Sequence, residues 1–122
     1  MKQIIFTEKA PAAIGPYSQA VLSNGTLYVS GQIALALVEA GATIEDETRQ
    51  VMTNMQAILE AANMTFENVV KCTIFVKDMN NFVKINSVYG EFFPTNPPAR
   101  ETVEVARLPK DVNVEISCVA VD

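Results

Sequence analysis

The segment Val112-Asn-Val-Glu-Ile-Ser-Cys-Val-Ala-Val121 alternates strictly between two sets of side chains. One set is entirely apolar: Val112, Val114, Ile116, Cys118 and Ala120. The other set is mixed: Asn113, Glu115, Ser117, Val119 and Val121. Because successive side chains of a strand point to opposite faces of a sheet, this period predicts a β-strand with one face in the core. On the second face, Glu115 is either a solvated residue or the partner of a cation.

Two segments with a helical period can cover the apolar face. Thr43-Ile-Glu-Asp46 has the form of a capping box, and a wide apolar stripe follows it: Val51, Met52, Met55, Ile58, Leu59 and Ala62. Asn63, which tolerates a left-handed cap, is the expected end of this helix. A second helix is predicted between a cap at Asp78 or Asn80 and a stop at Pro94. Its stripe is Phe82, Ile85, Tyr89 and Phe92.

The remaining segments predict strands and loops. Residues 1–7 and 69–76 have strand-like composition, and Asn24-Gly25 is a strong hairpin signal between residues 19–22 and 26–30. Residues 32–41 show no period and predict an irregular loop. Residues 100–106 predict a strand between Pro97-Pro98 and Pro109. We expect this strand to pair with residues 112–121 as an antiparallel hairpin that turns near Lys110.

The predicted order β-β-β-α-β-α-β-β is typical of the α+β class, with the two helices packed on one face of the sheet. Two helices leave the other face uncovered, although it carries Val119, Val121 and further apolar residues. A large exposed apolar patch is unusual on a monomer, so we expect this face to be covered by oligomerisation. The length of 122 residues indicates one domain over residues 1–122.

Composition excludes several classes of function. The net charge of -5 and the scattered lysines argue against a nucleic-acid surface. The absence of histidine excludes an imidazole base and histidine-containing metal sites. Cys72 and Cys118 lack metal-ligand spacing, and their apolar surroundings predict buried free thiols in a reducing compartment. No apolar run approaches the ~20 residues of a membrane span, so the protein is expected to be cytoplasmic.

Arg100 is the first candidate site residue, because Thr102 lies two residues along the same strand face and the pair can cradle a small carboxylate. Three other positions have two readings each. Tyr17, in a stiff proline-containing loop, either packs at the base of the loop or faces a site. Ser30-Gly31 either ends a strand or exposes backbone N–H groups. Asn86, beside the second helical stripe, is either solvated or functional.

Several motifs together resemble the RidA family, also called YjgF/YER057c/UK114. They are Ala12-Ala-Ile-Gly-Pro-Tyr-Ser-Gln19, Val29-Ser-Gly-Gln-Ile33, Val76-Lys-Asp78, Pro98-Ala-Arg100 and Val103-Glu-Val-Ala-Arg-Leu-Pro-Lys110. The resemblance implies the chorismate-mutase-like α+β fold, assembled as a homotrimer around a central barrel with clefts between subunits. It also implies hydrolytic deamination of 2-iminobutanoate and 2-iminopropanoate, released by pyridoxal-phosphate dehydratases, to a 2-oxo acid and ammonia, with no metal and no cofactor.

The resemblance also implies roles for individual residues. Arg100 matches the arginine that clamps the substrate carboxylate, and Glu115 matches the glutamate that orients the attacking water. The positions that match the cleft lining are Tyr17, Ser30, Gly31 and Asn86. We expect Glu115 to come from the strand next to Arg100, with Tyr17 and Asn86 from a neighbouring subunit.

The sequence departs from the family at two places. Glu101-Thr102 replaces a common Ser-Cys, which removes a thiol but keeps a hydroxyl, so only a thiol-dependent activity is in question. Residues 34–41 replace a proline-containing turn, which changes the loop beside the cleft.

Two rival functions follow from the same residues. One is a module that binds a 2-oxo acid or small metabolite through Arg100 without turnover. The other is an activity on RNA, against which the acidic charge and the lack of histidine argue.

Overall fold

The computed structural model describes all residues from Met1 to Asp122. A six-stranded sheet runs in the order β1-β2-β3-β6-β4-β5. The strands are β1 (Lys2–Ile5), β2 (Ala20–Ser23), β3 (Thr26–Gln32), β4 (Val69–Val76), β5 (Ala99–Glu104) and β6 (Val114–Val121). The helices are α1 (Leu35–Glu39), α2 (Ile44–Ala61) and α3 (Phe82–Glu91), with short 3-10 helices η1 (Phe66–Asn68), η2 (Met79–Asn81) and η3 (Pro109–Asp111).

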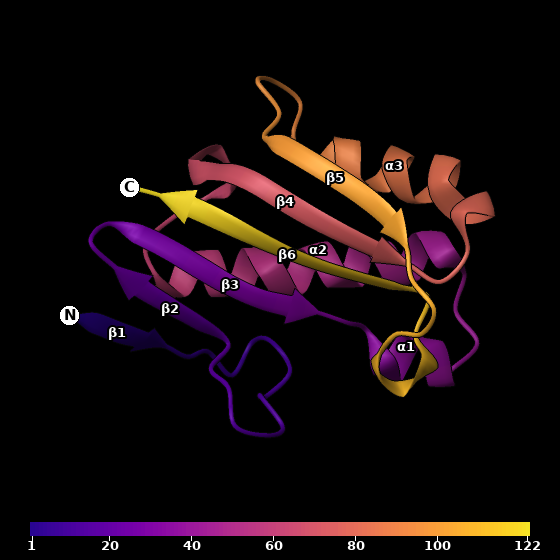
Figure 1. Cartoon of the computed structure of the whole chain (residues 1–122), viewed down its shortest axis with the longest axis horizontal. Coiled ribbons are helices and arrows are strands. Elements are labelled where there is room, and N and C mark those ends of the chain that lie inside the picture. The colour runs from indigo at the N-terminus through magenta and orange to yellow at the C-terminus, as the bar shows by residue number, and fades with distance from the viewer.

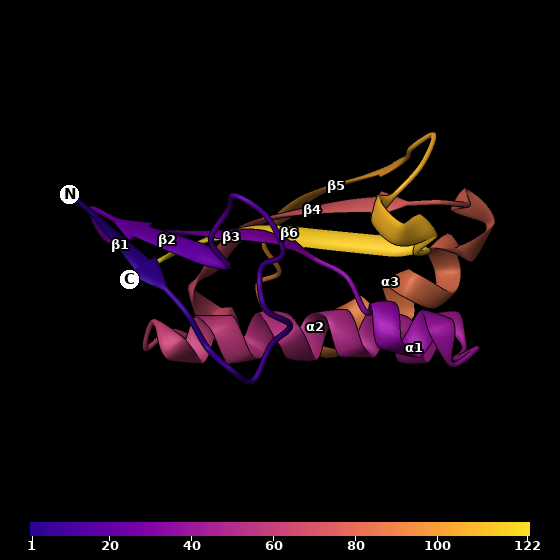
Figure 2. The same cartoon turned by 90° about the horizontal axis from the view of Figure 1, so that it is seen from below.

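The helices lie on one side of the sheet, and the other face carries none (Figures 1 and 2). We call the uncovered side the bare face. Tyr28, Val103 and Val121 are 53%, 42% and 38% exposed there. The predicted α+β class with helices on one face is therefore confirmed. No helix of the chain is both long and apolar enough to cross a membrane.

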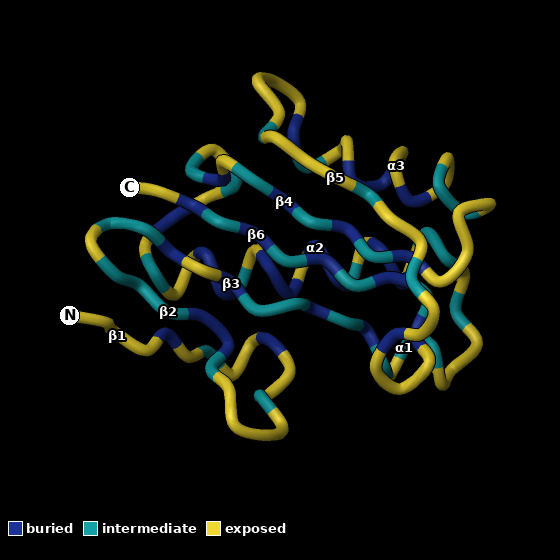
Figure 3. Tube along the Cα trace, in the orientation of Figure 1, coloured by how far each residue is buried: buried dark blue, intermediate teal, exposed yellow.

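β6 lies in the middle of the sheet, antiparallel to β3 on one side and to β4 on the other. Its predicted apolar set is buried throughout, and buried positions concentrate on the central strands and α2 (Figure 3). Cys72 and Cys118 are cross-strand partners, buried and free, as predicted. Burial raises the pKa of both thiols.

α2 forms as its pattern predicts. The Thr43 hydroxyl accepts a hydrogen bond from the Asp46 N–H at 3.1 Å. The negative charges of three acidic residues in the first turn also interact favourably with the positive end of the helix dipole. Asn63 adopts the expected left-handed conformation just beyond the end, with φ of 59°. The hairpin prediction at Asn24-Gly25 is also confirmed, because both residues have positive φ, as a type I′ turn requires.

The expected antiparallel pairing of residues 100–106 with 112–121 is wrong. β5 pairs in parallel with β4 at the edge of the sheet, and β4 separates it from β6. The α3 crossover accounts for the direction, because a helical connection is the usual way to join parallel strands. Burial accounts for the position: β5 is exposed at every residue except Thr102, whereas β6 has a continuous apolar face that needs neighbours on both sides.

Two helix predictions also need correction. Residues 32–41 are not an irregular loop, because they contain α1, and the order of elements gains a helix before α2. A five-residue helix is too short to show a period in the sequence. α3 ends at Glu91, so Phe92 lies beyond it, and Val88 takes a buried place on the helix. Asp78 caps η2 through the Asn80 N–H at 2.9 Å, not α3.

Glu47 joins α2 to the start of β6. Its carboxylate is 1% exposed and accepts hydrogen bonds from the Asn113 N–H at 2.9 Å and from Asn113 Nδ2 at 2.7 Å. The two bonds compensate for burying the carboxylate and pin one end of the central strand to the longest helix.

We predict that Glu47→Ala destabilises the protein by about 1–3 kcal/mol, because it leaves the partly buried Asn113 N–H without its acceptor. Urea unfolding followed by circular dichroism measures the change. Asp46→Ala is the matched control, since it removes the same charge from the same turn but from an exposed side chain. Equal losses in the two variants would contradict the role of Glu47.

Candidate active site

Arg100 leaves the sheet on the helix side. It lies opposite Cys72 of β4, a core residue, so its side chain points towards α3. Asn86 Oδ1 accepts a hydrogen bond from Arg100 Nη1 at 2.6 Å. The guanidinium carbon lies 5.0 Å from the centroid of the Tyr89 ring and 5.6 Å from that of Phe82. These distances are in the range of cation–π contacts, so α3 orients the arginine through one hydrogen bond and two rings.

The Arg100 charge has no acidic partner in the chain, because every ion pair involves other residues. Most of its five N–H groups therefore remain available for an anion. A hollow of about 450 Å³ adjoins it, with walls that include Tyr89, Phe93 and Pro98. A planar guanidinium beside such a hollow can hold a carboxylate by two parallel hydrogen bonds.

Two buried hydroxyl groups on the helix side have no hydrogen-bond partner. They are Thr102 Oγ1 and the Tyr89 hydroxyl. Thr102 lies opposite Ile74, so it shares its face with Arg100, as the sequence predicts. Burial raises the pKa of Tyr89, which keeps its hydroxyl protonated and able to donate. Unpaired buried polar groups are rare in proteins, and a functional role is one of the explanations for them.

Glu115 lies on the bare face, opposite Phe75 of β4. Its carboxylate rests directly on the backbone of Gly31, where a Cβ would overlap it. A side chain at this position would therefore displace the Glu115 carboxylate. Partial burial raises the pKa of Glu115 above its usual range, and no cation offsets that effect. A desolvated carboxylate of this kind is suited to act as a general base.

Ser30 and Gly31 occupy an irregularity of β3, where the register with β6 shifts between Val29 and Gln32. The Ser30 hydroxyl donates to the Ser18 carbonyl at 2.6 Å, and the Ser30 N–H donates to the Gln19 carbonyl at 2.9 Å. These bonds tie the irregular part of β3 to the loop that carries Tyr17. Tyr17 is 54% exposed and lines the same hollow as Gly31, so it faces the cleft rather than packing at the base of its loop.

Gln19 is a structural residue of this region that the sequence reasoning missed. It is 4% exposed, and its side chain accepts from the Thr7 N–H at 2.8 Å and donates to the Pro11 carbonyl at 2.9 Å. The side chain thereby replaces the backbone partners that a proline-containing loop lacks. A glutamine at the end of such a loop is the only sequence signal of this role.

The predicted site residues thus form two groups on opposite faces of the sheet. Arg100, Asn86 and Thr102 lie on the helix side, and Glu115 lies with Ser30 and Gly31 on the bare face. One chain does not bring Arg100 and Glu115 together. The expectation that they come from adjacent strands is wrong, because β4 lies between β5 and β6. The expectation that Asn86 comes from a different subunit than Arg100 is also wrong, because their side chains are hydrogen-bonded within one chain.

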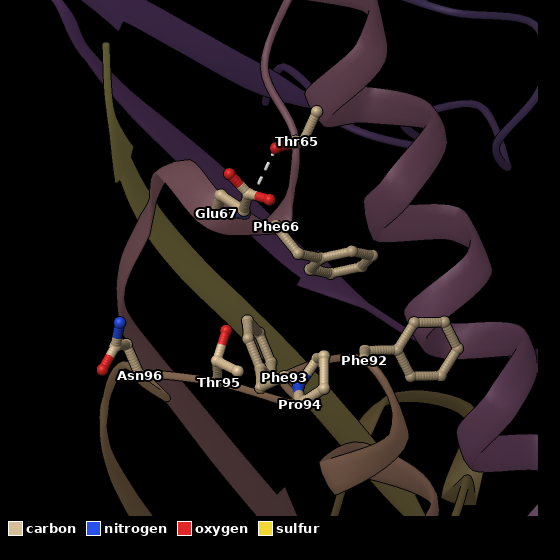
Figure 4. A pocket seen from close by; sticks show the side chains of 8 residues that line it. All are labelled: Thr65, Phe66, Glu67, Phe92, Phe93, Pro94, Thr95 and Asn96. Carbon is tan, nitrogen blue, oxygen red and sulfur yellow. Dashed lines mark hydrogen bonds between the residues drawn. The ribbon is translucent and has the colours of Figure 1, made fainter.

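Another hollow shares Phe93 with the hollow beside Arg100 (Figure 4). It has a volume of about 560 Å³ between η1 and the segment after α3. The rings of Phe66, Phe92 and Phe93 pack against one another there, and Glu67 is its only ionisable residue. None of the predicted site residues lines it.

Together these features define a single-sheet α+β protein with an arginine half-site on one face and a carboxylate half-site on the other. The chain belongs to the family described as Endoribonuclease L-PSP, which matches residues 7–122. The resemblance to RidA proteins is confirmed by a solved structure from the conserved Rid protein family of Yersinia pestis. That structure is 45% identical, covers all of both chains and superposes with a TM-score of 0.92.

Three further proteins are similar to this chain over nearly its whole length. A RutC family protein of Pyrococcus horikoshii is 50% identical over 98% of both chains. A Bos taurus protein named 2-iminobutanoate/2-iminopropanoate deaminase is 47% identical, over 99% of this chain and 90% of its own. The structure of Escherichia coli TdcF with bound serine is 41% identical over 98% of both chains, with a TM-score of 0.90.

The raised pKa of Glu115 predicts a pH-dependent effect on stability. A folded-state pKa above the unfolded value contributes stability below the unfolded pKa, and this contribution is lost as pH rises through the folded pKa. We therefore expect Glu115→Gln to be more stable than the unaltered protein at pH 7, with the difference shrinking as pH falls through the raised folded pKa and lost below the ordinary glutamate pKa. Urea unfolding at several pH values and one protein concentration measures it.

Glu101→Gln is the matched control for this measurement. Glu101 is also a carboxylate of the bare face, but its hydrogen bond from Lys71 lowers its pKa. Its replacement should therefore show no stabilisation at pH 7. A Glu115→Gln variant that is less stable than the unaltered protein at pH 7 would contradict the assignment of a desolvated carboxylate.

Proposed function

We propose that the protein hydrolyses reactive 2-imino acids and their enamines, such as 2-iminobutanoate and 2-iminopropanoate, to 2-oxo acids and ammonia. The proposal rests on one observation. The same small domain holds an oriented guanidinium without an acidic partner, on Arg100, and a desolvated carboxylate, on Glu115. The name of the bovine relative supports the substrate class. The serine bound to TdcF supports a site for small molecules with a carboxylate.

In this proposal Arg100 binds the substrate carboxylate through its free N–H groups. Guanidinium matches a carboxylate bidentately and stays charged at every working pH. Asn86 occupies one N–H, and the Tyr89 ring limits the tilt of the plane. Both contacts reduce the freedom that Arg100 loses on binding, which is how a preorganised site gains affinity.

Glu115 acts as the base. It takes a proton from water while the water oxygen attacks the C=N carbon of the protonated imine, which gives a neutral tetrahedral carbinolamine. The protonated Glu115 then gives that proton to the amine nitrogen. The C–N bond breaks, and the hydroxyl proton passes to the departing ammonia, so that the 2-oxo acid and an ammonium ion form. Water and the protonated imine thus balance the 2-oxo acid and ammonium, and the reaction needs no covalent intermediate on the protein.

The hydroxyl groups near the clamp have a proposed role in holding the intermediate. Thr102 and Tyr89 have unsatisfied hydrogen-bonding capacity, and Tyr17, Ser30 and Gly31 line the part of the site nearest Glu115. Because no thiol takes part in the steps above, the replacement of the family cysteine by Thr102 is compatible with deamination.

We further propose that the site forms between copies of the chain in a homotrimer. Arg100 of one copy and Glu115 of the next would complete one site, which a single chain cannot do. The bare face, with its exposed Tyr28, Val103 and Val121, supplies the apolar area for assembly. A cytoplasmic location, where dehydratases release imines, fits this activity.

A binding module for 2-oxo acids is the alternative, and the serine in TdcF favours it because serine is not an imine. Action on RNA is suggested by the family description, but the net charge of -5 and the absence of histidine argue against it. We therefore expect no nucleic-acid partner.

A coupled assay tests the proposal. Threonine dehydratase supplies 2-iminobutanoate, and semicarbazide traps the imine that remains. We expect the protein to accelerate imine decay, Glu115→Gln to lower the catalysed rate about 10²–10⁴-fold, and Arg100→Ala to lower kcat/KM about 10–100-fold. Glu101→Gln, an exposed neighbour of Arg100, should keep full activity. Calorimetry should show that Glu115→Gln still binds 2-oxobutanoate.

Two results would overturn deamination. The first is a rate equal to spontaneous hydrolysis with 2-oxobutanoate still bound, which leaves the binding module. The second is degradation of RNA by the purified protein at a rate that survives Arg100→Ala.

Mixing two inactive variants tests the shared site. Arg100→Ala and Glu115→Gln, denatured together and refolded, should regain activity because about one quarter of the interfaces in randomly mixed trimers combine an intact arginine with an intact glutamate. Each variant refolded alone is the control. Absence of recovery, with mixed trimers shown by mass spectrometry, would place both residues in one chain's own site.

A further inference from the structure

We propose that the hollow at the end of β3 binds the side chain of the substrate, and that Leu35 and Ala36 of α1 set the length it accepts. The inference rests on the proposed function, because it takes the positions of the substrate carboxylate and of the base from it. The substrate class it assigns is 2-imino acids whose aliphatic side chain is longer than the ethyl group of 2-iminobutanoate.

The hollow adjoins the carboxylate half-site. Gly31 belongs to both, since it supports the Glu115 carboxylate on one side and lines the hollow on the other. Tyr17 forms the opposite wall. A 2-imino acid has three groups on its reacting carbon: the carboxylate, the nitrogen and the side chain. With the carboxylate on Arg100 and Glu115 beside the reacting carbon, the side chain is the group left to enter the hollow.

The walls of the hollow are suited to an aliphatic chain. Its volume is about 490 Å³, whereas an ethyl group displaces roughly two waters of ~30 Å³ each. Ile14, Ile33, Leu35 and Ala36 contribute apolar surface, whereas Gln19, Gln32, Glu39 and Lys110 are polar residues of the lining. Longer chains therefore find unoccupied apolar space, and each methylene that leaves water should raise kcat/KM about fourfold.

α1 presents these two residues because its other side is anchored. Ala34, at its N-terminus, is 4% exposed, and its carbonyl accepts from the N–H groups of Leu37 and Val38 at 3.1 and 3.2 Å. Leu37 packs against the main core, whereas Leu35 and Ala36 line the hollow. The segment that departs most from the family pattern is thus the segment that shapes this wall.

The experiment compares two imines made in situ by an L-amino acid oxidase, one from alanine and one from leucine, with semicarbazide trapping. The unaltered protein should show at least a fourfold higher kcat/KM for the leucine imine. Ala36→Phe should lower that value about tenfold and leave the alanine imine within about twofold. Ala40→Phe, at the exposed C-terminal cap of α1 and outside the hollow, is the matched control and should change neither.

Equal losses for both imines in Ala36→Phe, with unchanged circular dichroism, would overturn the inference, and so would an unaltered protein without length preference. Calorimetry with pyruvate and 4-methyl-2-oxopentanoate separates this inference from the proposed function. Suppose that the longer acid binds more tightly, that Ala36→Phe abolishes this difference, and that no imine is turned over. This result would contradict deamination but support the hollow as the side-chain pocket. If the two acids bind with equal affinity and turnover is intact, deamination is upheld and the hollow is not the side-chain pocket.

Discussion

Burial of β6 between β3 and β4 is the constraint on which the other features depend. Its apolar side chains face α2, and the Glu47–Asn113 hydrogen bonds hold one end of the strand against that helix. Because side chains alternate, the register that places Val114 and Ile116 in the core also places Glu115 on the bare face. A shift by one residue would bury the carboxylate and expose the core, so packing and the candidate base are set by the same register.

The central place of β6 has a consequence for the arginine. With both edges of β6 occupied, β5 joins the outer edge of β4, which it reaches through the α3 crossover. The crossover brings Asn86 and Tyr89 to Arg100 on the helix side. Arg100 and Glu115 therefore lie on opposite faces of one sheet. Under the proposed function they would meet only between copies of the chain, and a symmetric assembly is the simplest arrangement that joins unlike halves of identical copies.

Both half-sites hold groups that a stable fold alone would not favour. Glu115 is partly desolvated and has no cationic partner, and its carboxylate occupies the space that a side chain at Gly31 would need. Two hydroxyls near Arg100 are buried without hydrogen-bond partners. Deviations of this kind in an otherwise regular domain are expected where function competes with stability. The hollow beside α1 adjoins the carboxylate half-site, since Gly31 borders both.

The sequence by itself determined the α+β class, the strand at residues 112–121, α2 with its Thr43 cap and the Asn24-Gly25 hairpin, because each depends on local periodicity or local backbone preference. The roles of the candidate site residues came instead from the resemblance of several motifs to the RidA family. Only the tertiary structure decided the order of the strands, the presence of α1 and the grouping of the site. Strand order depends on which edges are free once β6 is buried, and that competition between distant segments leaves no local signal. For the same reason Arg100 and Glu115, fifteen positions apart in the printed sequence, could not be assigned to opposite faces of the sheet from the sequence.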